Sequence, residues 1–519
     1  MSSAVPLSLD WDEVANGYNA YSIAQTAKDE YGHLLPLQLE SFNDFKMPGY
    51  TYTLVPFVWL LGLSDFTVRL PSAIIGTLSV LVIYLMARKI TGYESIGLAS
   101  AAITTIAPWH LQFSRVAFEP VGVMLFVPLG VYLLLKGLED KKYFYFSAIS
   151  FAISFYFYYS VRVFVPLFLI TLAIIYRKEL AKNLKSLTFA AVLGAVLLFP
   201  IGLSILKPQS SARLSVVSVF SDQSIGIDAA IKNAQAGNTP VSRLINHRYV
   251  AYGKEIALGY VKHFSPQFLF ISGDPNIRHG VRGMGVLYWI DLPFLAVGLI
   301  YLFKKDKKAA KFAISWILLS PLPAAFAIPT PHALRTLASI PIYEIVIACG
   351  VVYFLLNVHK YRQLVTSSVA LGYAIFFGVY LNNYYVKYPT ESAMDWGYGY
   401  RELYTYLSKV EGNYDAIYIT GEYWKPYIYY LYYSKYDPTL YQSQVNHAKI
   451  GKYYFAATSW DSDFWWKEVD NFGSIASKKR VLFALKPEEM SKLNGIGGTI
   501  RVDSIMLGNK PVFEIFEKR

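Results

Sequence analysis

Long apolar stretches alternate with short polar loops through the middle of this 519-residue chain. About ten of these stretches, roughly 15–23 residues long in most cases, have the length and composition of membrane-spanning helices. They lie at 70–88, 94–112, 119–136, 143–160, 163–176, 186–206, 284–303, 312–328, 336–356 and 363–382. The stretch at 163–176 is short for a bilayer, so we expect it to be tilted or partly enclosed by its neighbours. The pattern predicts a mainly α-helical, polytopic transmembrane bundle over residues 70–382.

The basic residues predict an orientation, because loops rich in lysine and arginine stay on the cytoplasmic side of a membrane. Basic residues follow the first, third, fifth, seventh and ninth stretches: Arg88, Lys89; Lys136, Lys141, Lys142; Arg177, Lys178, Lys182, Lys185; Lys304, Lys305, Lys307, Lys308, Lys311; Lys360, Arg362. Every second loop is therefore basic, and residues 1–69, the large loop 207–283 and residues 383–519 are expected on the opposite, external face. An external N-terminal segment needs a preceding span to deliver it, so we expect a first transmembrane helix to be missing from this sequence.

Two segments outside the bundle have patterns of their own. Residues 50–64 are apolar but short, and counting them as a span would place the basic loops outside, so we interpret them as an interfacial helix. Residues 383–519 predict a small α/β domain, with a helix at 399–410 and strands at 415–420, 452–457, 480–484 and 511–516. The tyrosine-rich segment 414–441 could stack on sugar rings or form a packed core, and the packed core is favoured.

Composition supports a membrane protein and argues against several other classes. Only 16% of the residues are charged, whereas a soluble domain has about 25%. The net charge of +12 comes from a few short loops, which favours topology and headgroup contact over nucleic-acid binding. Cys349 is the single cysteine, so a disulfide framework is excluded. The sequence shows neither a Cys/His metal cluster nor a glycine-rich phosphate loop, and we predict no metal and no cofactor.

The N-terminal segment contains the first candidate for chemistry, the acidic pair Asp12 and Glu13. Transfer of a sugar to a hydroxyl or amine requires a base that takes the acceptor's proton. A carboxylate close to the membrane face fits that role. Acidic residues outside a membrane also serve as helix caps or solvated groups, so the pair alone is not diagnostic.

Two further candidates lie at expected external ends of the bundle. Lys46, shortly before Pro48, could anchor the chain at the headgroups or hold a lipid phosphate as a point charge. Arg115 and Glu119 lie between the second and third stretches. A helix N-terminus tolerates Glu119, but that explanation leaves Arg115 unexplained, and ionisable groups at spans usually face a polar interior.

The last candidates lie before the ninth stretch and in the preceding external loop. His332 and Arg335 open a helix, where a cation is unfavourable, so an anion held nearby would explain them. Arg278 and His279 add two more cations in a turn-rich loop and form a possible donor or acceptor loop.

These residues resemble the GT-C glycosyltransferases, specifically the protein O-mannosyltransferase and aminoarabinose-transferase group, over most of 1–382. Asp12-Glu13-Val14 with Gly17 matches the Asp-Glu motif of the group, which implies Asp12 as general base and Glu13 as its supporting carboxylate. Lys46 resembles the lysine of the group's Lys-Pro-Pro motif, although this chain has Lys-Met-Pro. Arg69-Leu70-Pro71-Ser72-Ala73 resembles the start of the group's second span.

The resemblance extends to the cationic segments. Arg115 to Glu119 is similar to an Arg-x-x-x-acid motif whose arginine contacts the lipid phosphate and whose acid, usually aspartate, lines the site. His332 and Arg335 resemble the cationic stretch before a late span. The resemblance implies no nucleotide-sugar site and no essential catalytic metal.

The resemblance implies a function as well. We expect an inverting glycosyltransferase of the plasma membrane that uses a polyprenyl-phosphate-linked sugar, with its active site and C-terminal domain extracytoplasmic. Its partners would be the donor, membrane lipids and an acceptor that is a protein, a lipid or a glycan, without nucleic acid. The alternatives are a lipid-linked oligosaccharide ligase or polymerase, a lipid flippase or transporter, and a non-catalytic sugar-binding scaffold. A transporter would favour internal repeats and midplane charges, which the sequence does not show.

Overall fold

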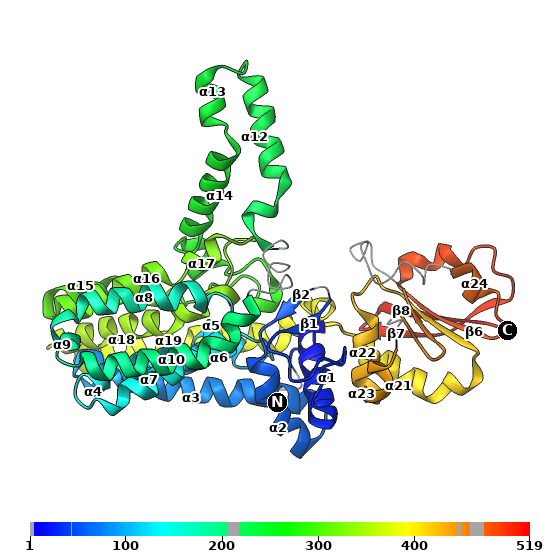
Figure 1. The fold of residues 1–519 in the computed structure, drawn as a ribbon, viewed down its shortest axis with the longest axis horizontal. Helices are drawn as coiled ribbons and strands as arrows, with labels where there is room; N and C mark the ends of the chain where they lie inside the picture. The colour runs from blue at the N-terminus through cyan, green and yellow to red at the C-terminus, as the bar shows by residue number, and fades with distance from the viewer. Residues whose placement is uncertain (1–4, 43, 206–216, 445–447, 457–471) are drawn as a thin grey trace. The chain divides into compact units, whose positions relative to one another are not determined.

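The computed structural model describes residues 5–42, 44–205, 217–444, 448–456 and 472–519, and Figure 1 shows its helices and strands. The chain divides into two compact units. The mixed unit comprises Met1–Pro36, Thr51–Pro71 and Tyr384–Arg519, and the helical unit comprises Leu37–Tyr50 and Ser72–Asn383. The N-terminal segment and the C-terminal residues therefore belong to one body, although most of the chain separates them.

The helical unit contains a helix at each of the ten predicted stretches. These helices are α3 (Asp65–Thr91, beginning in the mixed unit), α4 (Glu94–Ile106) with α5 (Pro108–Phe113), α6 (Val121–Gly137), α7 (Lys142–Phe155), α8 (Val161–Ile175), α10 (Leu184–Ile205), α15 (Asp291–Lys305), α16 (Lys307–Leu319) with α17 (Leu322–Ala325), α18 (Ile340–Asn357) and α19 (Arg362–Asn382). A short helix, α9 (Arg177–Ala181), lies in the loop before α10. The segment 50–64 is also helical, as α2 (Gly49–Leu61), and its position at the membrane interface stays a prediction. The prediction of a polytopic helical bundle is confirmed.

Among the described residues, four helices are long and apolar enough by themselves to cross a membrane: Asp65–Thr91, Leu184–Ser204, Leu334–Asn357 and Arg362–Glu391. Four apolar helices are shorter, at Gly49–Leu61, Glu94–Ile106, Val121–Gly137 and Val161–Ile175. A helix needs about 20 apolar residues to span the hydrocarbon core alone. The shorter members therefore depend on extension by neighbouring segments, as α5 extends α4.

Two predicted stretches are only partly helical. The stretch 284–303 becomes helical at Asp291, because the Val286 and Leu287 amides donate instead to the carbonyls of Phe268 and Leu269. The stretch 312–328 breaks after Leu319, where Pro321 lacks the amide hydrogen that a continuing helix requires. The non-helical start of 284–303 and the non-helical end of 312–328 both lie on the side of the bundle that carries Arg278, His332 and Arg335.

Helices α15 and α18 of the helical unit pack in very close contact. A Cβ added to Gly298 would lie 1.9 Å from the Val346 carbonyl oxygen, and one added to Gly350 would lie 1.9 Å from the Phe294 oxygen. The two backbones can approach this closely only because both positions are glycine. Small residues serve the same purpose between helices in membranes generally.

The basic loops of the bundle pair with one another, as alternating topology requires. Lys89, in the loop after the first stretch, forms an ion pair with Glu139 in the loop after the third. Lys308, after the seventh stretch, forms one with Glu179, after the fifth. The two loops of each pair therefore meet at the same end of their helices.

The predicted external loop 207–283 is largely helical in its described part, while residues 206–216 lie outside the described residues. It forms α12 (Gln223–Gln235), α13 (Pro240–Ile245) and α14 (Arg248–Lys262), which make a projecting helical hairpin (Figure 1). The loop then returns through η2 (Gln267–Ile271) and η3 (Ile277–His279) to the bundle. The segment between α14 and α15 therefore places Arg278 and His279 against the helical unit itself.

The mixed unit contains the predicted C-terminal sheet. Its strands are β3 (Ala416–Ile419), β4 (Lys449–Ile450), β5 (Tyr453–Phe455), β6 (Val481–Leu485), β7 (Thr499–Leu507) and β8 (Lys510–Lys518), in the order β4-β5-β3-β6-β8-β7. β3 is parallel to β5 and β6, and the other pairs are antiparallel. The four predicted strands are confirmed over their described residues. The sequence missed β4, which has two residues, and β7, an edge strand with charged positions.

Some helices of the mixed unit pack against this sheet, and others connect it to the N-terminal segment. They include α1 (Trp11–Thr26), the predicted helix α21 (Tyr400–Val410), α22 (Pro426–Tyr433) and α23 (Pro438–Gln442). The tyrosines of α22 are mostly buried, and Tyr429 stacks on Tyr400 with ring centroids 4.1 Å apart. Gly17 of α1 lies so close to Tyr432 that an added Cβ would be 2.7 Å from its ring. The tyrosine-rich segment is a packed core, as favoured from the sequence.

Candidate functional site

The Asp-Glu motif lies at the start of α1 in the mixed unit. Asp10 caps this helix by accepting a hydrogen bond from the Glu13 amide at 2.8 Å, and Glu13 Oε2 accepts one from the Asp10 amide at 3.2 Å. This reciprocal capping box satisfies two amides that a helix start leaves unpaired. The first turn of α1 is therefore held rigidly, and Asp12 lies on it.

Glu13 is fixed by a second set of contacts. Arg69 donates from Nε to Glu13 Oε1 at 2.8 Å and from Nη2 to Oε2 at 2.6 Å, and the two side chains are 1% and 0% exposed. The same guanidinium donates to the carbonyls of Pro6 and Ser8. Glu13 thus acts as the buried counter-ion of Arg69, which ties α1 to the start of α3.

Asp12 faces a different direction from Glu13. Successive helical residues are rotated by about 100°, so the side chain of Asp12 leaves the helix in a different direction from that of Glu13. The Asp12 side chain is accordingly partly exposed. A carboxylate on a rigid turn with access to solvent can accept a proton from an incoming acceptor, which Glu13 cannot do without breaking its ion pair.

In the helical unit, the structure brings together three segments that are distant in sequence. Gln112 Nε2 donates to the Arg278 carbonyl at 2.8 Å, and Trp109 Nε1 donates to the Ala333 carbonyl at 3.2 Å. The Asp274 carboxylate accepts from the Ala333 amide at 2.7 Å. These segments carry six of the predicted site residues: Arg115, Glu119, Arg278, His279, His332 and Arg335.

Aromatic packing closes the same assembly. The His279 ring packs against both Phe113 and Phe118, with centroid distances of 5.9 and 6.2 Å, and those two rings lie 6.4 Å from each other. It also lies 4.6 Å from the ring of His332. His279 is therefore enclosed on several sides, and it connects the Arg115 segment to the segment before α18.

Lys46 is placed at this end of the helical unit by a short hairpin rather than by the three segments described above. It ends β2 (Asp44–Lys46), which pairs with β1 (Leu39–Ser41), and its side chain is mostly buried with Nζ 5.1 Å from the Phe42 ring. The following Gly49 amide donates to the Tyr156 carbonyl at 2.8 Å. Phe157 then packs against both Gly49 and Gly122 of α6. The strand with Lys46 is thus joined to the start of α6, just after Glu119.

Two buried histidines of this assembly, His332 and His263, have pKa values shifted against the charged form. Burial, reinforced by neighbouring cationic groups, lowers the pKa of His332 well below its usual range. Burial likewise lowers the pKa of His263, whose Nε2 accepts from the His332 amide, to about 4. The interpretation of His332 as a cation therefore needs correction. Arginines supply the charge, and Arg335 is positioned by its bonds to the carbonyls of Ile328 and Pro329.

The structure also shows a constellation that the sequence did not reveal. Asp274, His279 and His332 each offer one possible ligand atom, and these three atoms lie within 4.8 Å of one another. The expectation of no bound metal stays a prediction, while the folded chain groups three residues that could hold an ion. The three residues have no recognisable spacing, because α15, α16 and α17 separate the two histidines.

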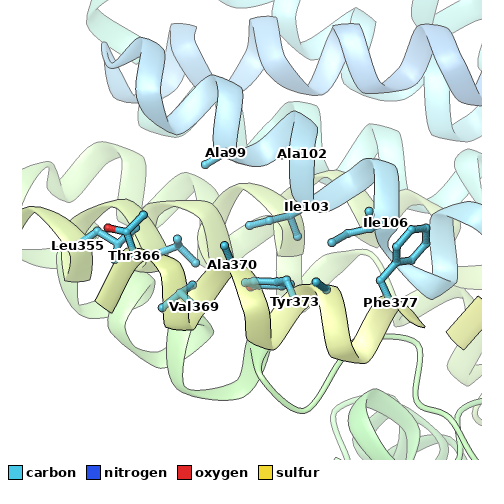
Figure 2. Close-up of a pocket in the computed structure, with 12 residues that line it drawn as sticks. Ala99, Ala102, Ile103, Ile106, Leu355, Thr366, Val369, Ala370, Tyr373 and Phe377 are labelled. Atoms are coloured by element: carbon cyan, nitrogen blue, oxygen red, sulfur yellow. The ribbon is translucent and has the colours of Figure 1, made fainter. Parts of the chain in front are cut away.

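An apolar groove lies between α4, α18 and α19 in the same unit (Figure 2). Its volume is about 380 Å³, and aliphatic and aromatic side chains form almost all of its lining. Ile106 lies at one end of the groove, immediately before α5, and its carbonyl accepts from Tyr288 Oη at 2.7 Å. The groove therefore ends close to the segment that leads to Arg115.

Comparison with known proteins identifies the architecture. The family model described as dolichyl-phosphate-mannose-protein mannosyltransferase matches residues 46–202. The crystal structure of ArnT from Cupriavidus metallidurans in the apo state aligns with a TM-score of 0.56 at 11% identity, over 98% of this chain and 95% of that one. The same protein bound to undecaprenyl phosphate gives 0.55 at 11% identity, over 98% and 94%.

A third solved structure, the Archaeoglobus fulgidus oligosaccharyltransferase in the apo form, aligns with a TM-score of 0.48 at 12% identity over 82% of this chain and 60% of that one. A search among curated proteins finds no match. The chain has the GT-C fold and is an ArnT- and mannosyltransferase-like integral membrane protein. The family-model match and the fold together indicate a glycosyltransferase, which confirms the resemblance seen in the sequence.

Proposed function

We propose that this protein transfers a sugar from a polyprenyl-phosphate donor to an acceptor on the extracytoplasmic face of the plasma membrane. The observation that carries the proposal is the meeting of three segments rich in cationic residues at one end of the helical unit. A lipid phosphate at a membrane surface requires such a set of fixed positive charges. The similar ArnT structure was solved with undecaprenyl phosphate, a lipid of this chemical class.

The proposed reaction is a single displacement at the anomeric carbon. Asp12 takes the proton of the acceptor hydroxyl or amine as that atom forms its bond to the sugar. The bond from the anomeric carbon to the phosphate oxygen breaks, and its electron pair leaves with the phosphate. Lys46, Arg115 and Arg335 stabilise the negative charge that develops there. Attack from the face opposite the phosphate inverts the anomeric configuration.

The apolar groove fits the other end of the donor. A polyprenyl chain is a hydrocarbon, and burying it releases about 25 cal/mol for each Å² removed from water. The groove between α4 and α19 (Figure 2) would take only part of such a chain. Because it ends beside the segment leading to Arg115, a tail lying in it would direct the phosphate toward the cationic end.

A transfer assay with defined donors tests the proposed function. The purified full chain in liposomes is expected to consume polyprenyl-phosphate monosaccharides when envelope proteins, lipids and glycans are offered as acceptors. The product should have the opposite anomeric configuration to the donor, which NMR of the released glycan measures. Transfer from lipid-linked oligosaccharides alone would identify a ligase instead, and lipid movement without transfer would identify a flippase.

Arg115→Ala is expected to weaken donor binding by about ten- to a hundredfold, because a hydrogen bond to a charged group contributes about 1.5–3 kcal/mol. Binding of a polyprenyl phosphate without sugar measures this effect independently of the reaction. Arg115→Lys should retain part of the affinity, since the charge remains while the planar fork is lost. Lys254→Ala, on the projecting hairpin, is the matched control and should bind as the wild type does. Unchanged binding by Arg115→Ala would remove this residue from the site.

A further inference from the structure

The cluster of Asp274, His279 and His332 has the dimensions of an ion-binding site. Asp274 Oδ2 lies 2.8 Å from His279 Nδ1 and 3.9 Å from His332 Nδ1. In a tetrahedral zinc site with bonds of about 2.0–2.1 Å, neighbouring ligand atoms are about 3.3 Å apart. These two distances lie on either side of that value, and all three ligand atoms lie within 4.8 Å of one another. Side-chain movements of about 1 Å would therefore bring both nitrogens and the oxygen around one ion.

Hydrogen bonding within the cluster explains only half of the arrangement. The bond between Asp274 and His279 accounts for that pair. His332 Nδ1 accepts a long hydrogen bond of 3.4 Å from the Arg335 amide, which an ion at this nitrogen would replace, and its ring lies 4.6 Å from that of His279. Two imidazoles aimed at one carboxylate oxygen are more than a structural hydrogen bond requires. A cation at their common point would use all three groups.

The surroundings fix the ligands before any ion arrives. Asp274 Oδ1 accepts from the Asn276 amide at 2.8 Å, and Oδ2 accepts from the Ala333 amide at 2.7 Å. His332 donates its own amide to His263 Nε2 at 3.1 Å. The Asp274 and His279 side chains are 2% and 5% exposed. Ligands held and oriented in this way by outer partners are typical of protein metal sites.

The donor set selects the class of ion. Two imidazole nitrogens with one carboxylate oxygen suit Zn²⁺ and its divalent first-row neighbours, whereas Ca²⁺ and Mg²⁺ prefer oxygen ligands alone. We propose that Asp274, His279 and His332 form a divalent transition-metal site of the zinc class, with one coordination position left for solvent. The proposal stands on the ligand geometry and does not depend on the proposed reaction.

Such an ion would connect the external loop to the segment before α18. Asp274 and His279 belong to the loop between α14 and α15, whereas His332 precedes α18. Arg278 adjoins one ligand, and Arg335 lies three residues after another. Metal binding would therefore fix the two segments that carry these arginines relative to each other. Its role would be to position Arg278 and Arg335 at this end of the helical unit.

Zinc binding by the full chain tests this inference. The protein is purified through a tag without histidines, stripped with a chelator and titrated with Zn²⁺. Metal analysis after dialysis should then find about one ion per chain. Cobalt substitution should give the intense visible bands of four-coordinate Co²⁺. A wild-type chain that retains no zinc under these conditions would overturn the proposal.

Variants distinguish this site from adventitious binding. His332→Ala should lower zinc affinity by more than a hundredfold, because losing an outer-sphere partner alone lowers it by about 10–100-fold. His332→Cys replaces the imidazole with a thiolate ligand and should retain zinc. Zinc binding by this variant would show that a substitution at position 332 does not by itself unfold the chain. His359→Ala, at an exposed position beyond α18, is the matched control and should bind like the wild type. Equal zinc binding by wild type and His332→Ala would contradict the assignment.

Discussion

Replacing Asp12 with asparagine is expected to abolish sugar transfer while leaving the fold and donor binding almost unchanged. A positioned general base contributes about 10²–10⁴ to the rate, so kcat should fall by that factor. Asparagine has nearly the same shape and cannot take the acceptor proton. The capping box of Asp10 and Glu13 and the Arg69 ion pair do not use this side chain, so the thermal midpoint should stay within a few degrees. Turnover with purified donor and acceptor measures the effect.

Two companion variants make the Asp12 test specific. Asp12→Glu keeps a carboxylate at a shifted position and should recover part of the activity. Asp395→Asn removes an exposed carboxylate elsewhere in the mixed unit and should leave turnover unaffected. Near-wild-type turnover by Asp12→Asn would show that another group accepts the proton.

Replacing Arg69 with methionine should strongly destabilise the mixed unit. The substitution leaves the Glu13 carboxylate buried without its counter-ion, and breaking one partner of a buried pair lowers stability by about 3–5 kcal/mol. It also leaves the Pro6 and Ser8 carbonyls without their shared donor. Protease susceptibility of the full chain in increasing urea measures the free energy of unfolding of this unit. The rate of cleavage within the mixed unit should rise accordingly.

A double-mutant cycle separates the ion pair from general effects of substitution. Glu13→Gln with Arg69→Met removes both charges, and the double variant should be more stable than Arg69→Met alone. Arg480→Met is the matched control, because its ion pair with Asp415 lies on the surface of the same unit. Exposed pairs contribute about 1 kcal/mol or less. If Arg69→Met is no more destabilising than Arg480→Met, the buried pair does not hold the first turn of α1.

Periodic hydrophobicity predicted the helical unit well, because a helix that crosses a membrane must satisfy its backbone internally and be apolar along its length. The exceptions have local causes. Residues 284–290 are as apolar as a span, yet the Val286 and Leu287 amides donate to the backbone carbonyls of Phe268 and Leu269. Hydrophobicity along the sequence cannot show this pairing, because the partners lie 18 residues earlier in the chain. β7 was missed because its exposed edge lacks the alternation of a buried strand.

The candidate site was only partly predictable from sequence. Charge and motif identified Arg115, Arg278 and Arg335, whose segments meet in the structure. Sequence could not show that Glu13 is committed to Arg69, since that pairing depends on how α1 meets α3. Nor could it show the grouping of Asp274, His279 and His332, because tertiary packing rather than spacing brings them together.

The proposed function requires Asp12 to act on a donor whose phosphate is held by the cationic residues of the helical unit. The most direct measurement is an experimental structure of the full chain with a polyprenyl phosphate bound. The account predicts the phosphate within hydrogen-bonding distance of Lys46, Arg115 or Arg335, and the Asp12 carboxylate within about 11 Å, two helical turns, of at least one of them. Asp12 farther than this from all three, with no cavity joining them, would contradict it.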